Sequence, residues 1–136
     1  MKRLYRQQHL VDFMAVVMQF TRIKIKWSFF SDEAPDLKRA CWAFPLAGWL
    51  LGLIAGGLGQ ILILMDLPII LGCAIAIAFC IYLSGAYHED GLADMADGFG
   101  AGGDGRRISN IIHDSRLGTY GVSALSLAII VRVLLV

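Results

Sequence analysis

Residues 43–65 read AFPLAGWLLGLIAGGLGQILILM and contain no charged side chain over 23 positions. A helix of that length rises about 34 Å, which is enough to cross a hydrocarbon core of about 30 Å. A second uncharged run, residues 67–87, follows after a single acidic residue, Asp66. The two runs therefore predict a transmembrane hairpin with a tight connecting loop.

The composition agrees with a membrane protein. The chain is 57% hydrophobic and 17% charged, with a mean hydropathy of +0.66, whereas soluble domains carry about 25% charged residues. The net charge of +1 gives no reason to expect nucleic acid as a partner. We expect an all-α, polytopic integral membrane bundle, with residues 1–136 forming a single membrane domain. Gly48, Gly52 and Gly56 recur at every fourth position and predict a groove that another helix can approach closely.

The N-terminal region, residues 1–42, is basic and holds eight of the twelve Lys and Arg residues. Its apolar part, residues 10–20, would form about 16 Å of helix, too short to span a bilayer. We expect it to lie at the interface or to enter part way, and the alternative is a helix packed against the bundle. Residues 31–35 predict a turn, followed by a helix that starts near Pro35.

A hairpin returns the chain to the side that it left, so residues 1–42 and 88–118 are predicted to face the same compartment. Both segments carry Lys or Arg, while the loop around Asp66 carries neither. By the positive-inside rule, both are predicted to be cytoplasmic.

Residues 88–98, HEDGLADMADG, hold four of the eleven acidic residues. Asp90, Asp94 and Asp97 are spaced i, i+4, i+7, which places them within roughly 60° of one another on a helix. Ionised carboxylates at such short distances repel one another unless some are protonated or a cation binds between them. Oxygen ligands of this kind suit Mg²⁺ or Mn²⁺, and Mg²⁺ usually binds together with a phosphate. The alternative is a solvated acidic face of a surface helix.

A glycine-rich loop and a second polar motif follow. Asp104 is predicted to cap a short helix over residues 105–113, and residues 114–121 read DSRLGTYG. Arg116 could clamp a phosphate and Asp114 could add a metal ligand, although the two could also simply pair with each other. Residues 119–136 predict the start of a third span. Arg132 is costly inside it unless its side chain snorkels or faces a polar interior.

Together, HEDGLADMADG and DSRLGTYG closely resemble the cobalamin synthase family of membrane enzymes, the adenosylcobinamide-GDP ribazoletransferases. Phe20-Thr21-Arg22 and residues 44–48, FPLAG, also resemble N-terminal signatures of that family. Chains of the family are longer, so this one resembles their N-terminal part. We expect a fragment that ends within an apolar span and has little activity alone.

The resemblance implies a late step of cobalamin biosynthesis in a multi-pass protein of the bacterial or archaeal inner membrane. Adenosylcobinamide-GDP and α-ribazole, or its 5′-phosphate, would react to give adenosylcobalamin, or its phosphate, and GMP. Mg²⁺ is the implied cofactor. The lipid bilayer is an implied partner, and a homo-oligomer or an association with other cobalamin-assembly enzymes is a further expectation.

Carried over to this chain, the resemblance implies three sets of site residues. The implied catalytic residues are Asp94, Asp97 and His88, and either His88 or an aspartate could take the hydroxyl proton. The implied metal ligands are Asp90, Asp94, Asp97 and Asp114. The implied phosphate- or nucleotide-binding residues are Gly91, Gly98, Ser115 and Arg116.

Two other functions compete with this interpretation. One is a CDP-alcohol phosphotransferase, whose motif also places aspartates on membrane helices; here Asp94 stands where that motif has an arginine. The other is an ion-conducting or non-catalytic membrane protein with the carboxylates along an ion path. Against the latter, the carboxylates lie beyond the apolar run rather than inside it.

Overall fold

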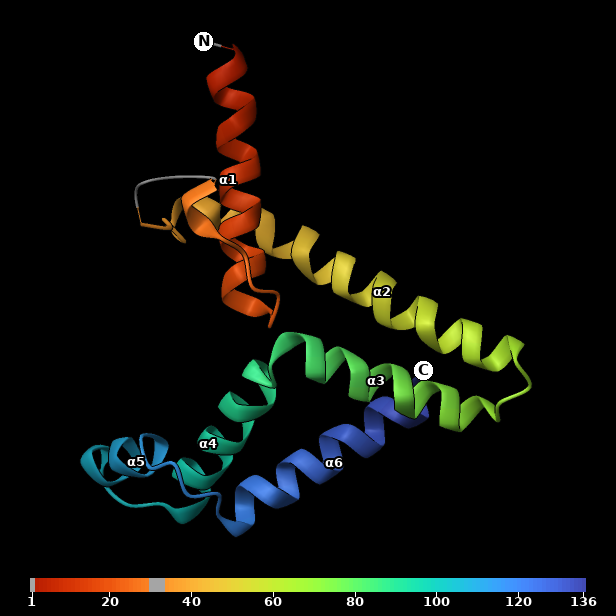
Figure 1. Ribbon diagram of the computed structural model, residues 1–136. Helices are drawn as coiled ribbons and strands as arrows, with labels where there is room; N and C mark the ends of the chain where they lie inside the picture. Colours follow the sequence, from red (N-terminus) through yellow and green to blue (C-terminus); the bar gives the residue numbers. More distant parts are fainter. Residues whose placement is uncertain (1, 30–33) are drawn as a thin grey trace.

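The computed structural model describes residues 2–29 and 34–136, and all regular secondary structure within these residues is helical (Figure 1). Residues 31–33 of the predicted turn lie outside the described residues, and the first helical turn after Pro35 begins at Arg39. The elements in chain order are α1 (Lys2–Phe20), η1 (Trp27–Phe29), η2 (Arg39–Ala43), α2 (Phe44–Leu64), α3 (Ile69–Ser84), α4 (Tyr87–Ala101), α5 (Gly105–Ile112) and α6 (Thr119–Leu135).

Helices α2 and α3 form the predicted antiparallel hairpin. Pro45 stands in the first turn of α2, where its missing N–H leaves no hydrogen bond unmade. The two helices approach closely through Gly59 and Gly72: a Cβ on Gly59 would lie 2.9 Å from the Ala76 Cβ. By contrast, a Cβ on Gly48, Gly52 or Gly56 would meet no atom of the described residues within 4 Å. The predicted groove is therefore open, and the close approach uses other glycines.

One continuous helical run, Arg39–Leu64, is long and apolar enough to cross a membrane: 26 residues with a mean hydropathy of 1.9 and only 17% of its apolar window buried. Helices α3 and α4 pass the same test only as a pair, and they are bent by 89° with respect to each other. Helix α6, with 17 residues, is a shorter apolar helix. The described chain thus has one candidate span, or two if the bent pair counts as one.

The composition of residues 67–87 predicted one helix that continues to Tyr87, and this prediction is wrong. Helix α3 ends at Ser84, and Gly85 and Ala86 adopt left-handed conformations with φ of 69° and 60°. In a continuing helix the Leu83 carbonyl would accept from the Tyr87 N–H. It accepts instead from the Arg22 N–H at 2.7 Å, which helps to stop the helix at this point.

Helix α1 is packed rather than free. It begins well before residue 10, and the buried side chains of Val16 and Val17 pack with Ala40, Ala43 and Ala47 of η2 and α2. Asp12 is only 3% exposed at this interface. Its carboxylate accepts from Arg39 at 2.9 Å, Gln8 at 3.2 Å and Trp42 at 3.4 Å. Helix α1 is therefore packed against η2 and the start of α2, as the alternative predicted, and its position at the membrane interface stays a prediction.

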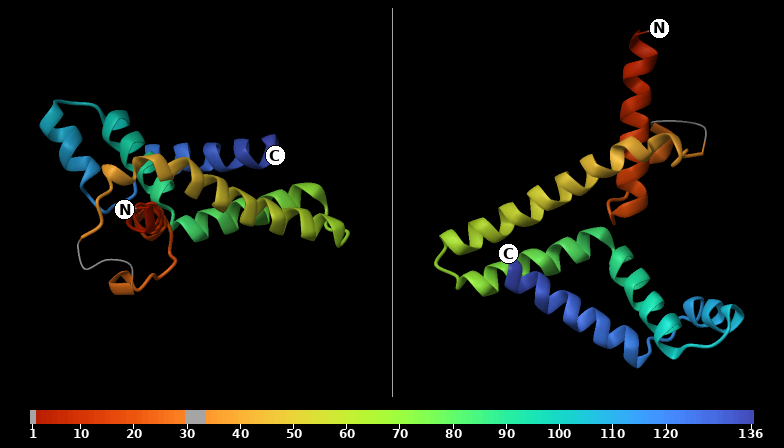
Figure 2. Two further views of the ribbon diagram at one scale, coloured as in Figure 1. Left: turned by 90° about the horizontal axis from the view of Figure 1, so that it is seen from above. Right: turned by 180° about the vertical axis from the view of Figure 1, so that it is seen from behind.

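Helices α1, α4 and α5 lie at the end of the hairpin opposite to the Asp66 loop (Figure 2). Helices α3, α4 and α6 outline three sides of a triangle, with α6 running back beside α3. This arrangement agrees with placing residues 1–42 and 88–118 on one side; that this side is cytoplasmic stays a prediction.

Candidate active site

Helix α4 carries the acidic motif and presents it on two faces. Glu89, Ala93 and Asp97 are buried at i, i+4, i+8 and belong to the face that packs against α6. Asp90 is exposed and Asp94 is half-buried. Each residue turns the helix by about 100°, so the three aspartates of the predicted stripe point in somewhat different directions. Asp97 is on the buried side of the stripe, while Asp90 and Asp94 are on the accessible side.

Asp90 and Asp94 line a cavity of about 270 Å³ together with the second polar motif. The other walls come from the end of α5 and the segment after it: Ile112, His113, Asp114, Ser115, Arg116 and Leu117. Asp104 supports this wall as predicted, because its carboxylate accepts from the Arg107 N–H at 2.9 Å and caps α5. Two sequence motifs more than fifteen residues apart thus meet in one acidic and basic cavity.

Asp114 and Arg116 form an ion pair with a shortest distance of 2.6 Å. This pairing is the alternative that the sequence left open, and it is observed. The Arg116 guanidinium holds the pKa of Asp114 below its ordinary value, and Asp114 in turn raises the pKa of Arg116. The Arg116 side chain is 87% exposed, so little packing prevents it from exchanging this partner for a ligand anion.

The Asp97 carboxylate caps helix α6 from a distance in sequence. One oxygen accepts from the Gly118 N–H at 2.7 Å and the other from the Gly121 N–H at 2.8 Å. These donors belong to the first turn of α6, whose N-cap residue, Gly118, has no side chain to cap it. A Cβ on either glycine would collide with the Asp97 carboxylate. The glycines of the second motif therefore make room for an aspartate of the first.

The remaining predicted residues lie in different surroundings. His88 stacks on Phe20, with ring centroids 6.3 Å apart, and lines another cavity. Gly98 is buried against α5, where a Cβ would lie 2.6 Å from Ile112 Cγ1. A Cβ on Gly91 would meet nothing within 4 Å, so its backbone is approachable. The structure thus brings Asp90, Asp94, Asp114, Ser115 and Arg116 together and places His88 and Gly98 outside their cavity.

The oxygen atoms of the acidic cavity are of the type that Mg²⁺ prefers. Within the residues that the structure describes, no three His, Cys, Asp or Glu side chains are close enough to form a complete metal site. A pair of carboxylates is nevertheless the usual protein contribution to Mg²⁺, which keeps several waters and binds substrate phosphates. Asp90 and Asp94, one turn apart on the accessible side of α4, fit that pattern.

One ion pair was not foreseen from the sequence. Arg132 of α6 donates to Glu89 of α4 at 2.9 Å. An arginine within an apolar run signals a polar partner, but Glu89, 43 positions away, could not be chosen from the sequence. This pair and Asp97 attach α4 to α6 at two points.

Apolar helices, one of them long enough to cross a membrane, with a cavity lined by acidic and basic side chains at one end are typical of a helical membrane protein. Residues 12–136 match the family model described as Cobalamin-5-phosphate synthase. The chain belongs to this family.

The curated relatives are named adenosylcobinamide-GDP ribazoletransferase. The relative from Azorhizobium caulinodans is 40% identical over 128 residues, which is 93% of this chain and 48% of the relative. The relative from Ralstonia pickettii is 39% identical over 128 residues, or 93% of this chain and 49% of the relative. The one from Bradyrhizobium diazoefficiens is 45% identical over 100 residues. The matched region thus spans 38% to 49% of the length of these three relatives, and no solved structure matches the chain.

Proposed function

We propose that this chain provides the phosphate-binding part of an adenosylcobinamide-GDP ribazoletransferase. In this reaction the hydroxyl of α-ribazole, or of its 5′-phosphate, attacks the phosphorus next to the cobinamide arm, and GMP leaves. The observation that supports this best is the single cavity that Asp90 and Asp94 share with Asp114, Ser115 and Arg116. In phosphoryl transfer a protein acts mainly by positioning and by charge stabilisation, and this cavity offers groups for both.

Asp90 and Asp94 are the proposed Mg²⁺ ligands, and Asp114 becomes a third candidate when Arg116 leaves it. Bound Mg²⁺ would neutralise the charge of the pyrophosphate group. Asp97 is the weakest of the four candidates, because both of its oxygens already accept backbone hydrogen bonds.

Arg116 is proposed to hold a non-bridging phosphate oxygen. Its planar fork matches a phosphate as it matches the Asp114 carboxylate. The Ser115 hydroxyl lines the same cavity and can donate to a neighbouring oxygen. Asp94 is better placed than His88 to accept the proton of the attacking hydroxyl, because His88 lines a different cavity.

Placement in the inner membrane, with the acidic cavity facing the cytoplasm, belongs to the same proposal. It is supported by the apolar run Arg39–Leu64 and by the position of the basic N-terminal region at the same end of the hairpin as α4. Full turnover is proposed to need the part of the protein that the relatives have in addition to the matched region.

The test measures GMP release from adenosylcobinamide-GDP and α-ribazole in membranes. It compares this chain alone with the chain fused to the unmatched half of the Azorhizobium caulinodans relative. We expect Mg²⁺-dependent release by the fusion and little release by the chain alone. In the fusion, Asp90→Asn and Asp94→Asn should each lower turnover by about 10² or more. The double variant should be little worse than the worse single one, since both remove ligands from one shared site.

Asp66→Asn is the matched control, since Asp66 lies in the loop between Leu64 of α2 and Ile69 of α3. It should leave turnover unchanged. Normal rates for both Asp90→Asn and Asp94→Asn, or additive losses without any Mg²⁺ dependence, would contradict the proposed site.

A further inference from the structure

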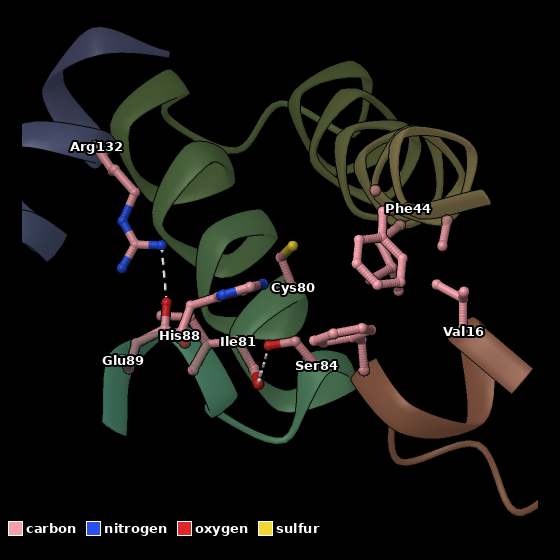
Figure 3. A pocket seen from close by; sticks show the side chains of 12 residues that line it. Val16, Phe44, Cys80, Ile81, Ser84, His88, Glu89 and Arg132 are labelled. Carbon is pink, nitrogen blue, oxygen red and sulfur yellow. Dashed lines mark hydrogen bonds and ion pairs between the residues drawn. The ribbon is translucent and has the colours of Figure 1, made fainter. Parts of the chain in front are cut away.

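A second cavity, of about 300 Å³, lies where α1, α2, α3, α4 and α6 meet (Figure 3). Its walls are mostly apolar, with Phe20 and Phe44 among them, while His88, Glu89 and Arg132 form a polar end. Small-molecule sites have this character: apolar walls with a few placed polar groups. The volume is at the lower end of the usual range for ligand sites, about 300–1,000 Å³, and suits one flat ring system.

The polar end contains a buried hydrogen-bond acceptor without a donor. The Glu89 side chain is only 10% exposed, and its Oε1 accepts from Arg132 Nη1 at 2.9 Å. Its Oε2 is buried, and no described group donates to it. Buried polar atoms are almost always hydrogen-bonded, because leaving one unsatisfied is costly. An atom of this kind at a cavity wall indicates a ligand that brings its own donor.

The apolar walls indicate a planar ligand. Phe20 contacts Phe44 and Tyr87 edge-on, both at 5.2 Å between ring centroids, and stacks with His88. Phe20, Phe44 and His88 line the same cavity as Glu89, and aromatic faces stack readily on nucleobases.

We propose that this cavity binds the guanine base of the GDP-bearing substrate, with Glu89 accepting from the guanine edge. This inference rests on the proposed function. Guanine presents two adjacent donors, N1–H and the 2-amino group, which match an acceptor carboxylate, and its O6 can accept from Arg132. The base of α-ribazole is a worse match: its ring nitrogens are one glycosidic nitrogen and one acceptor, so it brings no N–H to Glu89. Glu89 and Asp90 are consecutive in α4 and point about 100° apart around it, so the base and the phosphates of one nucleotide would bind on adjoining faces of this helix, each in its own cavity.

The first experiment needs no variant. Binding of GDP, IDP and ADP to the purified chain in lipid nanodiscs is measured by equilibrium dialysis, with and without Mg²⁺. IDP lacks the 2-amino donor, and ADP places an unprotonated ring nitrogen opposite the carboxylate. We expect GDP to bind at least tenfold more tightly than IDP, because IDP makes one hydrogen bond fewer to the charged carboxylate. ADP should be the weakest of the three.

The second experiment repeats the comparison on Glu89→Gln, with Asp66→Asn as control. In Glu89→Gln the preference for GDP over IDP should fall to about onefold, while Asp66→Asn should keep it. Equal binding of GDP, IDP and ADP by the unmodified chain, or no binding of any of them at millimolar concentration, would overturn the guanine assignment. An unchanged GDP preference in Glu89→Gln would overturn it as well.

The same data separate this assignment from the proposed phosphate site. Mg²⁺-enhanced binding that is equal for all three nucleotides would support the phosphate site and refute guanine recognition. A preference for GDP without any effect of Mg²⁺ or of Asp90→Asn would do the reverse.

Discussion

Replacing Asp97 by Asn tests whether this residue stabilises the fold or binds the metal. Asp97 is 7% exposed, and its carboxylate accepts two backbone N–H hydrogen bonds from the first turn of α6. Asn keeps the size of the side chain but presents one acceptor and one donor. One of the two N–H groups would then face an NH₂ group, and the negative charge at the helix N-terminus would be lost.

The size of the effect follows from those two losses. One buried hydrogen bond to a charged group is worth about 1.5–3 kcal/mol, and a favourable charge at a helix N-terminus adds about 0.3–1 kcal/mol. We therefore expect Asp97→Asn to reduce the local stability of the α4–α6 contact by about 2–4 kcal/mol. At 1.4 kcal/mol per factor of ten, that corresponds to a roughly 30- to 700-fold larger equilibrium constant for opening of the first turn of α6, and to a similar acceleration of amide exchange there.

Amide hydrogen exchange of residues 118–122, measured without Mg²⁺, reports directly on the opening of the first turn of α6. Asp94→Asn is the matched control, because Asp94 lies on the same helix and accepts no hydrogen bond from the described residues. It should leave exchange of these amides unchanged, or slow it slightly by removing a like charge from Asp90. If Asp97→Asn leaves exchange unchanged but weakens Mg²⁺ binding, Asp97 is a metal ligand and the capping argument is refuted.

Three further predictions follow from other parts of the structure. Burial would raise the pKa of Asp12, but the hydrogen bonds from Arg39, Gln8 and Trp42 lower this pKa below its ordinary value of 3.8. The ionised Asp12 should therefore stabilise the fold fully above pH 3.8, and this stabilisation should be lost as the pH falls through the lowered pKa. Asp12→Asn should remove this acid dependence in an unfolding titration. Gly98→Ala should destabilise the chain by about 1–3 kcal/mol in thermal unfolding, because the new Cβ would press on Ile112, whereas Gly91→Ala, in open space on the same helix, should stabilise it by about 0.5–1 kcal/mol. Asp66→Cys, with the exposed Cys41 changed to Ser, should react with a membrane-impermeant thiol reagent from outside the cell; labelling only from the cytoplasmic side would refute the topology.

Local patterns in the sequence predicted the helices well. The uncharged run 43–65 corresponds to α2, Phe44–Leu64, and the run 119–136 to α6, Thr119–Leu135. The predicted helix over 105–113 is α5, capped by Asp104 as expected. These features depend on periodicity, length and capping, all of which are contained in neighbouring residues.

What the sequence could not show depends on contacts between distant residues. The uncharged run 67–87 gives no sign of the 89° bend, because Gly85 resembles any glycine of a membrane helix and Ala86 is a good helix former. Arg22, whose N–H donates to the Leu83 carbonyl, is some sixty positions away from Leu83 in the chain. Spacing alone placed Asp90, Asp94 and Asp97 on one stripe, but only the position of α6 decides which of them is buried.

The two faces of α4 explain why one short motif contains so many acidic residues. On the inner face, Glu89 and Asp97 lie two turns apart and bind α6 through Arg132 and through its first-turn amides. On the accessible face, Asp90 and Asp94 have no such partner among the residues that the structure describes, and they line the cavity. Two carboxylates are thus neutralised by helix contacts before any ligand arrives, which lowers the charge repulsion that four ionised groups would otherwise impose. Because residues 112–117, which line the acidic cavity, lead directly into α6, the position of that cavity depends on the packing of α6 against α4.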